Sequence, residues 1–365
     1  MEHIKEQPKR TKKKNKARKK RYLIASISIV MAVIFSVVGA GLIYAGNLLS
    51  SINYQPVTND NNGTTQTNPN KPIINKKEFE DPTKVDGLYH DDAVINVLIV
   101  GSDSFHGAGE RSDSMMLLSI DRRHKKLKLT SFMRDMYLSL TDGWADNRIN
   151  ASYALGGISC LIDTIEMNFG IDIDRYVTID YDAVADIVDL LGGVEIDLSY
   201  GEANQINMGA QDYSSYATEG LNTLTGLQAR YYMRIRNVEG DDGYGDFSRT
   251  SRQRKVLSAL LDKFKDSNLI TITKLASEII PQITTDFSQS ELTSMVSNAL
   301  TYMNYDFSQL RLPADNMYYD DWVVISGMDQ AVLIPDLELN SALVNNFVYE
   351  DSFPENAKTL ADAGF

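Results

Sequence analysis

The chain has 365 residues, 43% of them hydrophobic, and a net charge of −13. A chain this long and this apolar can bury a sizeable core. Its single cysteine, Cys160, excludes an internal disulfide. Its acidic charge excludes general binding to nucleic acid, whose phosphates would repel it.

The amino terminus is predicted to cross a membrane once. Residues 1–21 contain eleven Lys and Arg against two Glu, and residues 22–46 follow without a charged side chain. Such a run is long enough to cross about 30 Å of hydrocarbon and longer than the apolar part of a cleaved signal peptide. The basic flank places the amino terminus in the cytoplasm. The sequence therefore predicts a single-pass signal-anchor in the cell membrane, with a cytoplasmic tail and an extracytoplasmic domain.

A polar stretch separates this anchor from the first patterned segment. Residues 47–92 are rich in Asn, Thr, Pro and Lys without apolar periodicity, and so predict a flexible spacer. Beyond it, β-rich runs alternate with helical patterns, which predicts a layered α/β domain with a largely buried sheet. Strands are predicted at 94–100, 114–121, 126–132, 175–180 and 194–198, helices at 150–155, 158–169, 181–191, 225–233, 247–264, 272–280 and 288–303, and an exposed loop at 199–219.

Two aspartates flank the loop between the first two predicted strands. Asp103 follows the carboxyl end of the first strand, where open α/β sheets bind ligands, and Asp113 begins the next strand. Two carboxylates brought together repel each other unless a cation lies between them, so the pair fits a Mg²⁺ site. Because aspartate also caps turns, an ordinary structural role explains the pattern equally well.

Arginine replaces lysine altogether between Leu129 and Lys255. The nine arginines are Arg134, Arg148, Arg175, Arg230, Arg234, Arg236, Arg249, Arg252 and Arg254. A guanidinium presents a planar fork of donors that matches phosphate or carboxylate oxygens two at a time. Any one of these arginines, taken alone, commonly forms an ion pair with a carboxylate at the surface. We predict such surface positions for Arg175 and Arg230. The roles of Arg148, Arg252 and Arg254 stay open.

The clustered arginines favour a polyanionic ligand. Arg234 and Arg236 are two residues apart and so share one face of an extended segment. Arg249 and Gln253 share one face of a predicted helix, with Arg252 beside them. They lie at its amino-terminal end, where free N–H groups already favour an anion. We therefore count Arg252 with the candidate ligands of this cluster.

Several common chemistries are absent from the sequence. No histidine follows residue 124, so a triad with a histidine in the later part of the domain is impossible, and zinc-ligand spacing is lacking. No G-x-x-x-x-G-K-[ST] loop occurs either. The remaining candidate chemistry is a bound cation together with arginines. Arg134 and Asp135 follow the third predicted strand and are predicted to lie at the same site. Phosphoryl transfer can proceed on such groups, because it needs mainly positioning and charge stabilisation.

In order along the chain, these residues resemble the LytR-CpsA-Psr family of membrane-anchored cell-wall glycopolymer transferases. The resemblance covers roughly residues 93–265, and its order makes it far more specific than any single motif. The matching segments are Asn96-Val97-Leu98 to Gly101-Ser102-Asp103, Arg111-Ser112-Asp113-Ser114, Arg134-Asp135, Asn147 to Gly157, Leu191 to Val194, Arg234-Ile235-Arg236 and Asp246 to Gln253.

The resemblance implies a three-layer α/β/α sandwich with a central mixed sheet at residues 93–320, preceded by one transmembrane helix. Residues 321–365 then form a carboxyl-terminal extension without an assigned role. The implied activity is Mg²⁺-dependent transfer of a polyprenyl-pyrophosphate-linked anionic or capsular glycopolymer, such as teichoic acid, to peptidoglycan. In this sequence the metal ligands would be Asp103 and Asp113, the catalytic residues Asp103, Arg111, Arg134 and Asp135, and the pyrophosphate ligands Arg134, Arg234, Arg236, Arg249, Arg252 and Gln253.

The chain departs from the usual family pattern at two positions. Met133 stands where a proline commonly precedes Arg134-Asp135, and Ser248 stands where a glycine is common. Neither change removes a predicted ligand, so they affect local loop shape. Three alternative functions stay open: a polyprenyl pyrophosphatase, a membrane-anchored regulator or sensor of wall synthesis, and a non-catalytic anchor for wall polymers.

Overall fold

The computed structural model describes residues 53–55, 83–85, 88–102, 112–211, 215–265, 267, 269–302 and 304–350. The predicted cytoplasmic tail and membrane anchor lie outside these residues. Within the described ranges, no helix is both long and apolar enough to cross a membrane.

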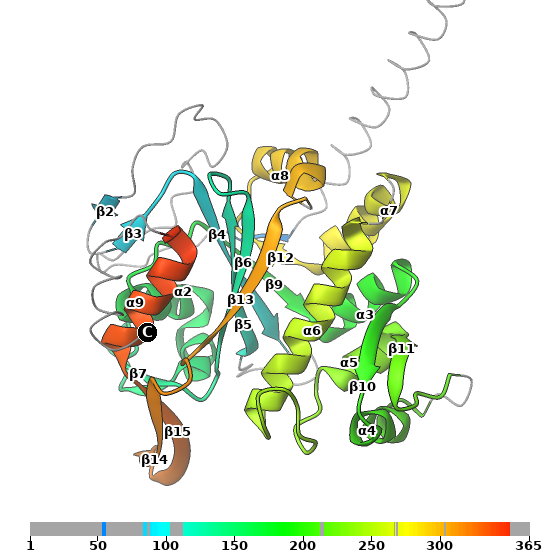
Figure 1. The fold of residues 1–365 in the computed structure, drawn as a ribbon. Helices are drawn as coiled ribbons and strands as arrows, with labels where there is room; N and C mark the ends of the chain where they lie inside the picture. Colours follow the sequence, from blue (N-terminus) through cyan, green and yellow to red (C-terminus); the bar gives the residue numbers. More distant parts are fainter. Residues whose placement is uncertain are drawn as a thin grey trace, which may run out of the picture. The chain divides into compact units, whose positions relative to one another are not determined.

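A mixed sheet of seven strands forms the centre of the described domain (Figure 1). In spatial order the strands are β1 (Asn53–Tyr54), β12 (Thr284–Thr285), β9 (Arg175–Asp180), β4 (Val94–Ser102), β5 (Ser112–Asp121), β6 (Lys126–Phe132) and β13 (Asp306–Leu312). β5 is antiparallel to β4 and to β6, whereas β9 is parallel to β4 and β13 is parallel to β6. The carboxyl ends of β4, β6, β9 and β13 therefore meet at one edge of the sheet.

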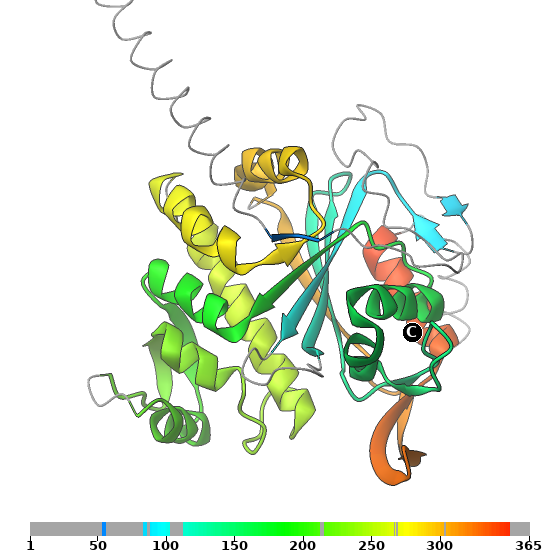
Figure 2. The same cartoon turned by 180° about the vertical axis from the view of Figure 1, so that it is seen from behind.

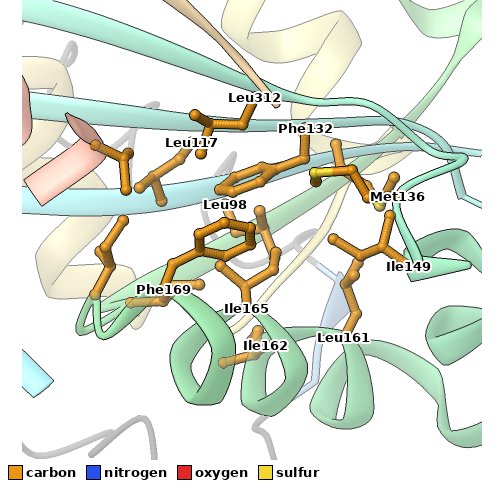
Figure 3. Close-up of a cluster of buried hydrophobic side chains, with 14 of the residues drawn as sticks. Leu98, Leu117, Phe132, Met136, Ile149, Leu161, Ile162, Ile165, Phe169 and Leu312 are labelled. Carbon is orange, nitrogen blue, oxygen red and sulfur yellow. The ribbon is translucent and has the colours of Figure 1, made fainter. Parts of the chain in front are cut away.

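Helices pack on both faces of this sheet. α2 (Ile149–Phe169) and α9 (Leu337–Tyr349) lie together on one face, where Leu98, Leu117 and Phe132 contribute to the largest apolar cluster (Figures 1 and 3). On the other face, α8 (Gln289–Tyr302) packs against a second cluster that includes Ile95. The side chains of β4 thus alternate between two cores, as expected of a strand buried on both faces.

A smaller group of elements has an apolar core of its own. The strands β10 (Val194–Leu198) and β11 (Gly220–Leu224) pair antiparallel and pack with α3 (Tyr181–Leu190), α4 (Tyr200–Ala210), α5 (Gly226–Tyr232) and α6 (Asp246–Lys265). Figure 2 shows α3 beside the carboxyl end of β9, with α5 and then α4 beyond it. This group forms a lobe in addition to the layered sandwich. The lobe carries most of the arginines that were predicted to bind an anion.

The prediction of an exposed loop at 199–219 is wrong for the first half of this segment, because these residues form α4. Ser199 caps this helix: its hydroxyl accepts from the backbone N–H of Glu202, and the Glu202 carboxylate accepts from the N–H of Ser199. Such a reciprocal capping box is visible in the sequence as Ser-x-x-Glu. The weak amphipathic pattern of the helix hid it.

Two predicted boundaries also require correction. Within the predicted spacer, β1 joins the central sheet, and β2 (Thr83–Val85) and β3 (Leu88–His90) pair with each other. The predicted extension 321–365 does not begin at a domain boundary. The hairpin β14 (Tyr318–Ile325) and β15 (Met328–Pro335) crosses residue 320, and α9 contributes Val344 and Val348 to the main core.

The remaining short elements complete the connections. They are β7 (Tyr137–Leu138), β8 (Asn147–Arg148), α7 (Leu269–Ile279) and the 3₁₀ turn η1 (Ile280–Gln282). β7 and β8 form a small antiparallel pair. This pair lies just after β6 and just before α2.

A buried carboxyl on α2 makes stability depend on pH. Burial, together with the nearby carboxylates of Asp172 and Asp163, raises the pKa of Glu166 from 4.5 to about 9. The folded state therefore holds a proton that the unfolded chain releases above its ordinary pKa, so this contribution to stability falls as pH rises from 4.5 toward about 9. We expect Glu166→Gln, which stays neutral, to lose less melting temperature than the wild type between about pH 5 and about pH 8.

Exposed Glu278 on α7 supplies the control, since Glu278→Gln removes a carboxylate without changing a buried site. Melting curves of the three proteins across this pH range measure the effect. Equal slopes for the wild type and Glu166→Gln would contradict a neutral Glu166 in the folded state.

Candidate functional site

The candidate site lies at the edge of the sheet where the parallel strands end. Arg134 follows the carboxyl end of β6, and Tyr181 follows the carboxyl end of β9 and begins α3. Asp103 comes directly after β4 in sequence but, like Arg111, lies outside the described residues. Loops at the carboxyl ends of strands are the usual ligand-binding position in open α/β sheets.

The backbone at position 113 has an unusual register. Gly101 pairs with Ser114 and Ser102 pairs with Ser112, so Asp113 is the extra residue of a β-bulge. Bulges re-aim side chains and are common beside active sites. A side chain at Gly101 would meet the Cβ of Ser114 at 2.9 Å, so glycine permits this close pairing. The predicted metal pair stays a prediction, with one member on a backbone irregularity at the expected edge.

A buried carboxylate connects two of the predicted arginines. Asp246, the first residue of α6, lies 2.6 Å from Nη2 of Arg249 and 3.2 Å from Nε of Arg134. Burial raises the pKa of Asp246, while Arg249 and Arg134 favour its charged form. Asp135 lies 3.6 Å from Nε of Arg134 and accepts a hydrogen bond from Arg148 at 3.3 Å. The loop after β6 and the amino terminus of α6 are thereby held together.

Three of the predicted arginines line one pocket of about 550 Å³. Its walls come from the start of α3, from α4, α5 and the segment after α5, and from the start of α6. The lining residues are Tyr181, Gln205, Met208, Gly209, Tyr231, Arg234, Ile235, Arg236, Asn237 and Arg249. Arg234 and Arg236 are exposed whereas Arg249 is buried, so positive charge extends from the mouth of the pocket to its inner wall.

Tyr181 connects two further predicted ligands. The guanidinium of Arg234 lies over its ring, 5.6 Å from the centroid. The buried side-chain amide of Gln253 donates to its hydroxyl at 2.9 Å. This packing places Arg234 and Gln253 at the same aromatic ring, and a cation over a ring face is an attractive contact.

Arg252 has a different role from the one we predicted. Its Nε donates to Glu202 at 2.8 Å, and its two terminal nitrogens donate to the carbonyls of Ile235, Val238 and Glu239 and to the hydroxyl of Ser248. All five N–H groups are thus directed to protein oxygens. Arg252 positions the segment that bears Arg234 and Arg236 and is removed from the candidate ligands.

The other arginines pair with carboxylates. Arg175 is fully buried beside Glu291, with Nη2 and Oε1 2.5 Å apart, so the prediction of a surface position is wrong. Arg230 is half-buried and pairs with Asp182 at 2.8 Å. Arg148 contacts Asp135 and borders the site, whereas Arg254 pairs with Asp242 farther along α6.

The two departures from the usual pattern have structural explanations. Met133 is fully buried in the main core, where its side chain adds apolar contact directly before Arg134. The hydroxyl of Ser248 accepts from Arg252 at 2.6 Å. A glycine could not supply this acceptor, so Ser248 takes part in positioning Arg252.

Sequence reasoning missed several residues of the site. Tyr181, Gln205 and Met208 line the pocket, and Asp246 connects Arg134 and Arg249. The capping box would have revealed α4 and with it Gln205 and Met208. The position of Tyr181 directly after a strand was an available signal, because the carboxyl ends of strands bear the site.

A second group of possible metal ligands lies away from this edge. Ligand atoms of His90, Asp172 and Asp174 all lie within 4.8 Å of one another. Protein contacts already use this group: His90 Nδ1 lies 2.7 Å from Asp172, and Asp174 accepts from the backbone N–H of Asn96. It is not the pair that we predicted for Mg²⁺.

The fold and the site define a class of protein. A mixed α/β domain with arginines gathered in a pocket at the carboxyl edge of its sheet is suited to bind an anionic group. The LytR_cpsA_psr family model matches residues 55–333, so the chain belongs to this family.

Relatives with assigned names are similar over much of the chain. The polyisoprenyl-teichoic acid–peptidoglycan teichoic acid transferase TagV of Bacillus subtilis (strain 168) is 29% identical over 240 residues, which are 62% of this chain and 60% of TagV. The regulatory protein MsrR of Staphylococcus aureus (strain COL) is 26% identical over 294 residues, 80% of this chain and 84% of MsrR. The match to TagV thus spans less than two thirds of that relative.

Solved structures share the fold. TagT of B. subtilis is 22% identical with a TM-score of 0.55, and the match covers 74% of this chain and 97% of TagT. The structure of the LytR-CPS2A-psr family protein YwtF (TagT) with bound octaprenyl pyrophosphate lipid matches with a TM-score of 0.52 and 22% identity, over 70% of this chain and 90% of the other. These similarities confirm a mixed α/β fold around a central mixed sheet.

Proposed function

We propose that the chain is a membrane-anchored phosphotransferase that attaches a polyprenyl-pyrophosphate-linked anionic glycopolymer to peptidoglycan. The pocket lined by Arg234, Arg236 and Arg249 carries this proposal. Its guanidinium groups suit a pyrophosphate, whose oxygens they can contact in pairs. The names of the relatives TagV and TagU, both teichoic acid transferases acting on peptidoglycan, support the same class of donor and acceptor.

The proposed reaction is a displacement at phosphorus. A hydroxyl oxygen of the acceptor forms a bond to the phosphorus that bears the glycopolymer, and the bond from this phosphorus to the bridging oxygen breaks. Polyprenyl phosphate leaves, a phosphodiester forms, and the hydroxyl proton passes to a base. Arg234, Arg236 and Arg249 would hold the pyrophosphate, while Arg134 would stabilise the charge that grows on the leaving phosphate.

Asp135 is the proposed base. It is only 22% exposed, lies beside Arg134 and projects from the loop at the carboxyl end of β6. Asp246 is more deeply buried and lies between two guanidinium groups, so it suits the positioning of Arg134 and Arg249. Carboxylates within reach of an acceptor hydroxyl are ordinary general bases.

Asp103 and Asp113 would hold Mg²⁺, with Arg111 near them. Oxygen ligands from two carboxylates match the preference of this ion, and the bulge at position 113 lies at the edge of the sheet beside Arg134. Bound there, Mg²⁺ would supply positive charge to the phosphate oxygens. The uncharged run 22–46 supports a location in the cell membrane with the site outside the cytoplasm.

The experiment is transfer from a polyprenyl-pyrophosphate glycan to a peptidoglycan acceptor by the full chain in detergent with Mg²⁺. We expect an Arg134→Ala, Arg236→Ala double variant to form product at least about 100-fold more slowly, because two donors to the phosphates are lost. The control is Arg230→Ala, which removes a paired arginine that does not line the pocket. Equal product from the wild type and the double variant would overturn the site assignment.

Two other functions are separated by related measurements. Release of polyprenyl phosphate without an acceptor would identify a pyrophosphatase. A regulatory role is the second candidate, because the relative MsrR is named a regulatory protein. Deleting residues 2–19 while retaining membrane insertion tests the regulatory role. If the transcriptional response is lost while transfer stays intact, the tail has a signalling function.

A further inference from the structure

The β14–β15 hairpin exposes large apolar side chains to solvent. Trp322 and Val324 are each 69% exposed, Met328 is 63% exposed and Tyr319 is 60% exposed. In both views of the domain the hairpin projects past the neighbouring elements (Figures 1 and 2). Exposed aromatic and apolar side chains gathered on one element are typical of binding surfaces.

The strand register arranges a particular set of side chains on one face of this hairpin. Trp322 lies opposite Ala331, and Val324 lies opposite Asp329. Asp320 precedes Trp322 by two residues and therefore shares its face. Residues two apart on a strand are about 7 Å apart, so the indole is flanked by a carboxylate toward each end of the hairpin. Small Ala331 leaves the space beside the ring open.

The base of the hairpin is attached directly to the candidate site. The N–H of Leu333 in β15 donates to the carbonyl of Asp135 at 2.9 Å. Tyr318 at the start of β14 stacks on Phe247, with ring centroids 5.9 Å apart and an interplanar angle of 29°. Phe247 follows Asp246 in α6, so the hairpin is anchored on both elements that hold Arg134 and Arg249.

The negative charge of the hairpin determines which kind of substrate can bind to it. Residues 318–335 contain Asp320, Asp321 and Asp329 and no lysine or arginine. An anionic glycopolymer is repelled by this surface and attracted by the arginine pocket. An uncharged sugar chain suits it, because the apolar face of a sugar ring packs on an indole and carboxylates accept hydrogen bonds from sugar hydroxyl and amide groups.

We propose that the Trp322 face of the hairpin binds the acceptor, as an uncharged N-acetylhexosamine glycan strand. This inference rests on the proposed function, because it divides the two substrates of the transfer between two surfaces. The donor phosphates bind in the arginine pocket, and the acceptor strand lies along the hairpin with its hydroxyl directed to the edge of the sheet. Trp322, Asp320 and Asp329 are then specificity residues for the acceptor.

The test uses the two tryptophans of the chain, Trp144 and Trp322. In a full chain carrying Trp144→Phe, the fluorescence of Trp322 is followed while a β-1,4-linked tetramer of N-acetylglucosamine is added. We expect a saturable change. In isothermal titration, Trp322→Ala is expected to weaken tetramer binding about tenfold or more, from loss of one stacking contact, and Asp320→Asn with Asp329→Asn to weaken it as well.

The control is Tyr200→Ala, which removes an aromatic side chain that is 73% exposed on α4. It should leave tetramer binding unchanged. No saturable change at Trp322, or equal affinity for wild type and Trp322→Ala, overturns the proposal. A response to lipid vesicles or to the anionic glycopolymer in place of the tetramer also overturns it.

A transfer assay separates this proposal from the proposed function. Trp322→Ala should raise the KM for the acceptor about tenfold and leave binding of the polyprenyl-pyrophosphate donor unchanged. A lower donor affinity in this variant would count against the division of substrates. If the wild type performs no transfer, the proposed function fails, and the tetramer titration still decides whether the hairpin binds glycan.

Discussion

Replacing Arg249 with lysine is expected to slow transfer about 100-fold or more, with little loss of fold stability. Arg249 is buried, lines the pocket and contacts Asp246 at 2.6 Å. A guanidinium can contact this carboxylate and a phosphate oxygen together, because its donors form a fork. A lysine keeps the positive charge beside Asp246, so the buried carboxylate stays compensated. It presents a point charge on a flexible stem, however, and loses the paired geometry.

The matched control lies on the same helix. Arg254 pairs with Asp242 and does not line the pocket, so Arg254→Lys should retain nearly wild-type transfer. Rates at saturating acceptor and melting temperatures are measured for both variants. If Arg249→Lys transfers at the wild-type rate, or Arg254→Lys is equally slow, the pocket is not the pyrophosphate site.

Replacing Arg252 with alanine should cost about 3–5 kcal/mol of unfolding free energy, because it breaks a buried ion pair by removing one partner. Arg252 is fully buried against Glu202, and three backbone carbonyls also lose their donor. Glu202 would remain as a buried uncompensated carboxylate at the start of α4. The segment that bears Arg234 and Arg236 should loosen as well, so donor binding weakens together with stability.

Denaturant unfolding measures this effect. Lys255→Ala is the control, since its partner Asp241 is exposed and such surface pairs contribute about 1 kcal/mol or less. An Arg252→Met, Glu202→Leu double variant should recover part of the loss, because the unpaired charge is gone. A loss below about 1 kcal/mol in Arg252→Ala would show that the buried network does not stabilise the lobe.

The central sheet was predictable where apolar patterning is strong. Val94 to Val100 is apolar except for Asn96, which matches a strand buried on both faces. The antiparallel strands β5 and β6 are joined by the short polar turn 122–125, which is typical of a hairpin. The clustering of arginines was predicted from their spacing, and the structure places Arg234, Arg236 and Arg249 on one pocket. Their roles as ligands stay predictions, as do the metal site of Asp103 and Asp113 and the role of Arg111.

Pairing partners were not predictable, because they depend on long-range contacts. Arg175 and Arg252 resemble the other arginines in sequence, yet their partners Glu291 and Glu202 lie far along the chain in different elements. The two-residue strands β1 and β12 acquire their place only from their neighbours in the sheet. The β14–β15 hairpin was missed, although Ser326-Gly327 separates two β-prone runs and is a typical two-residue hairpin turn, with positive φ at both positions.

Native mass spectrometry of the full chain with octaprenyl pyrophosphate tests the pyrophosphate pocket most directly. The wild type should retain one lipid per chain, and the Arg134→Ala, Arg236→Ala double variant should release it, while Arg230→Ala behaves as the wild type. No complex with the wild type, or equal retention by the double variant, would contradict the pocket as a polyprenyl-pyrophosphate site.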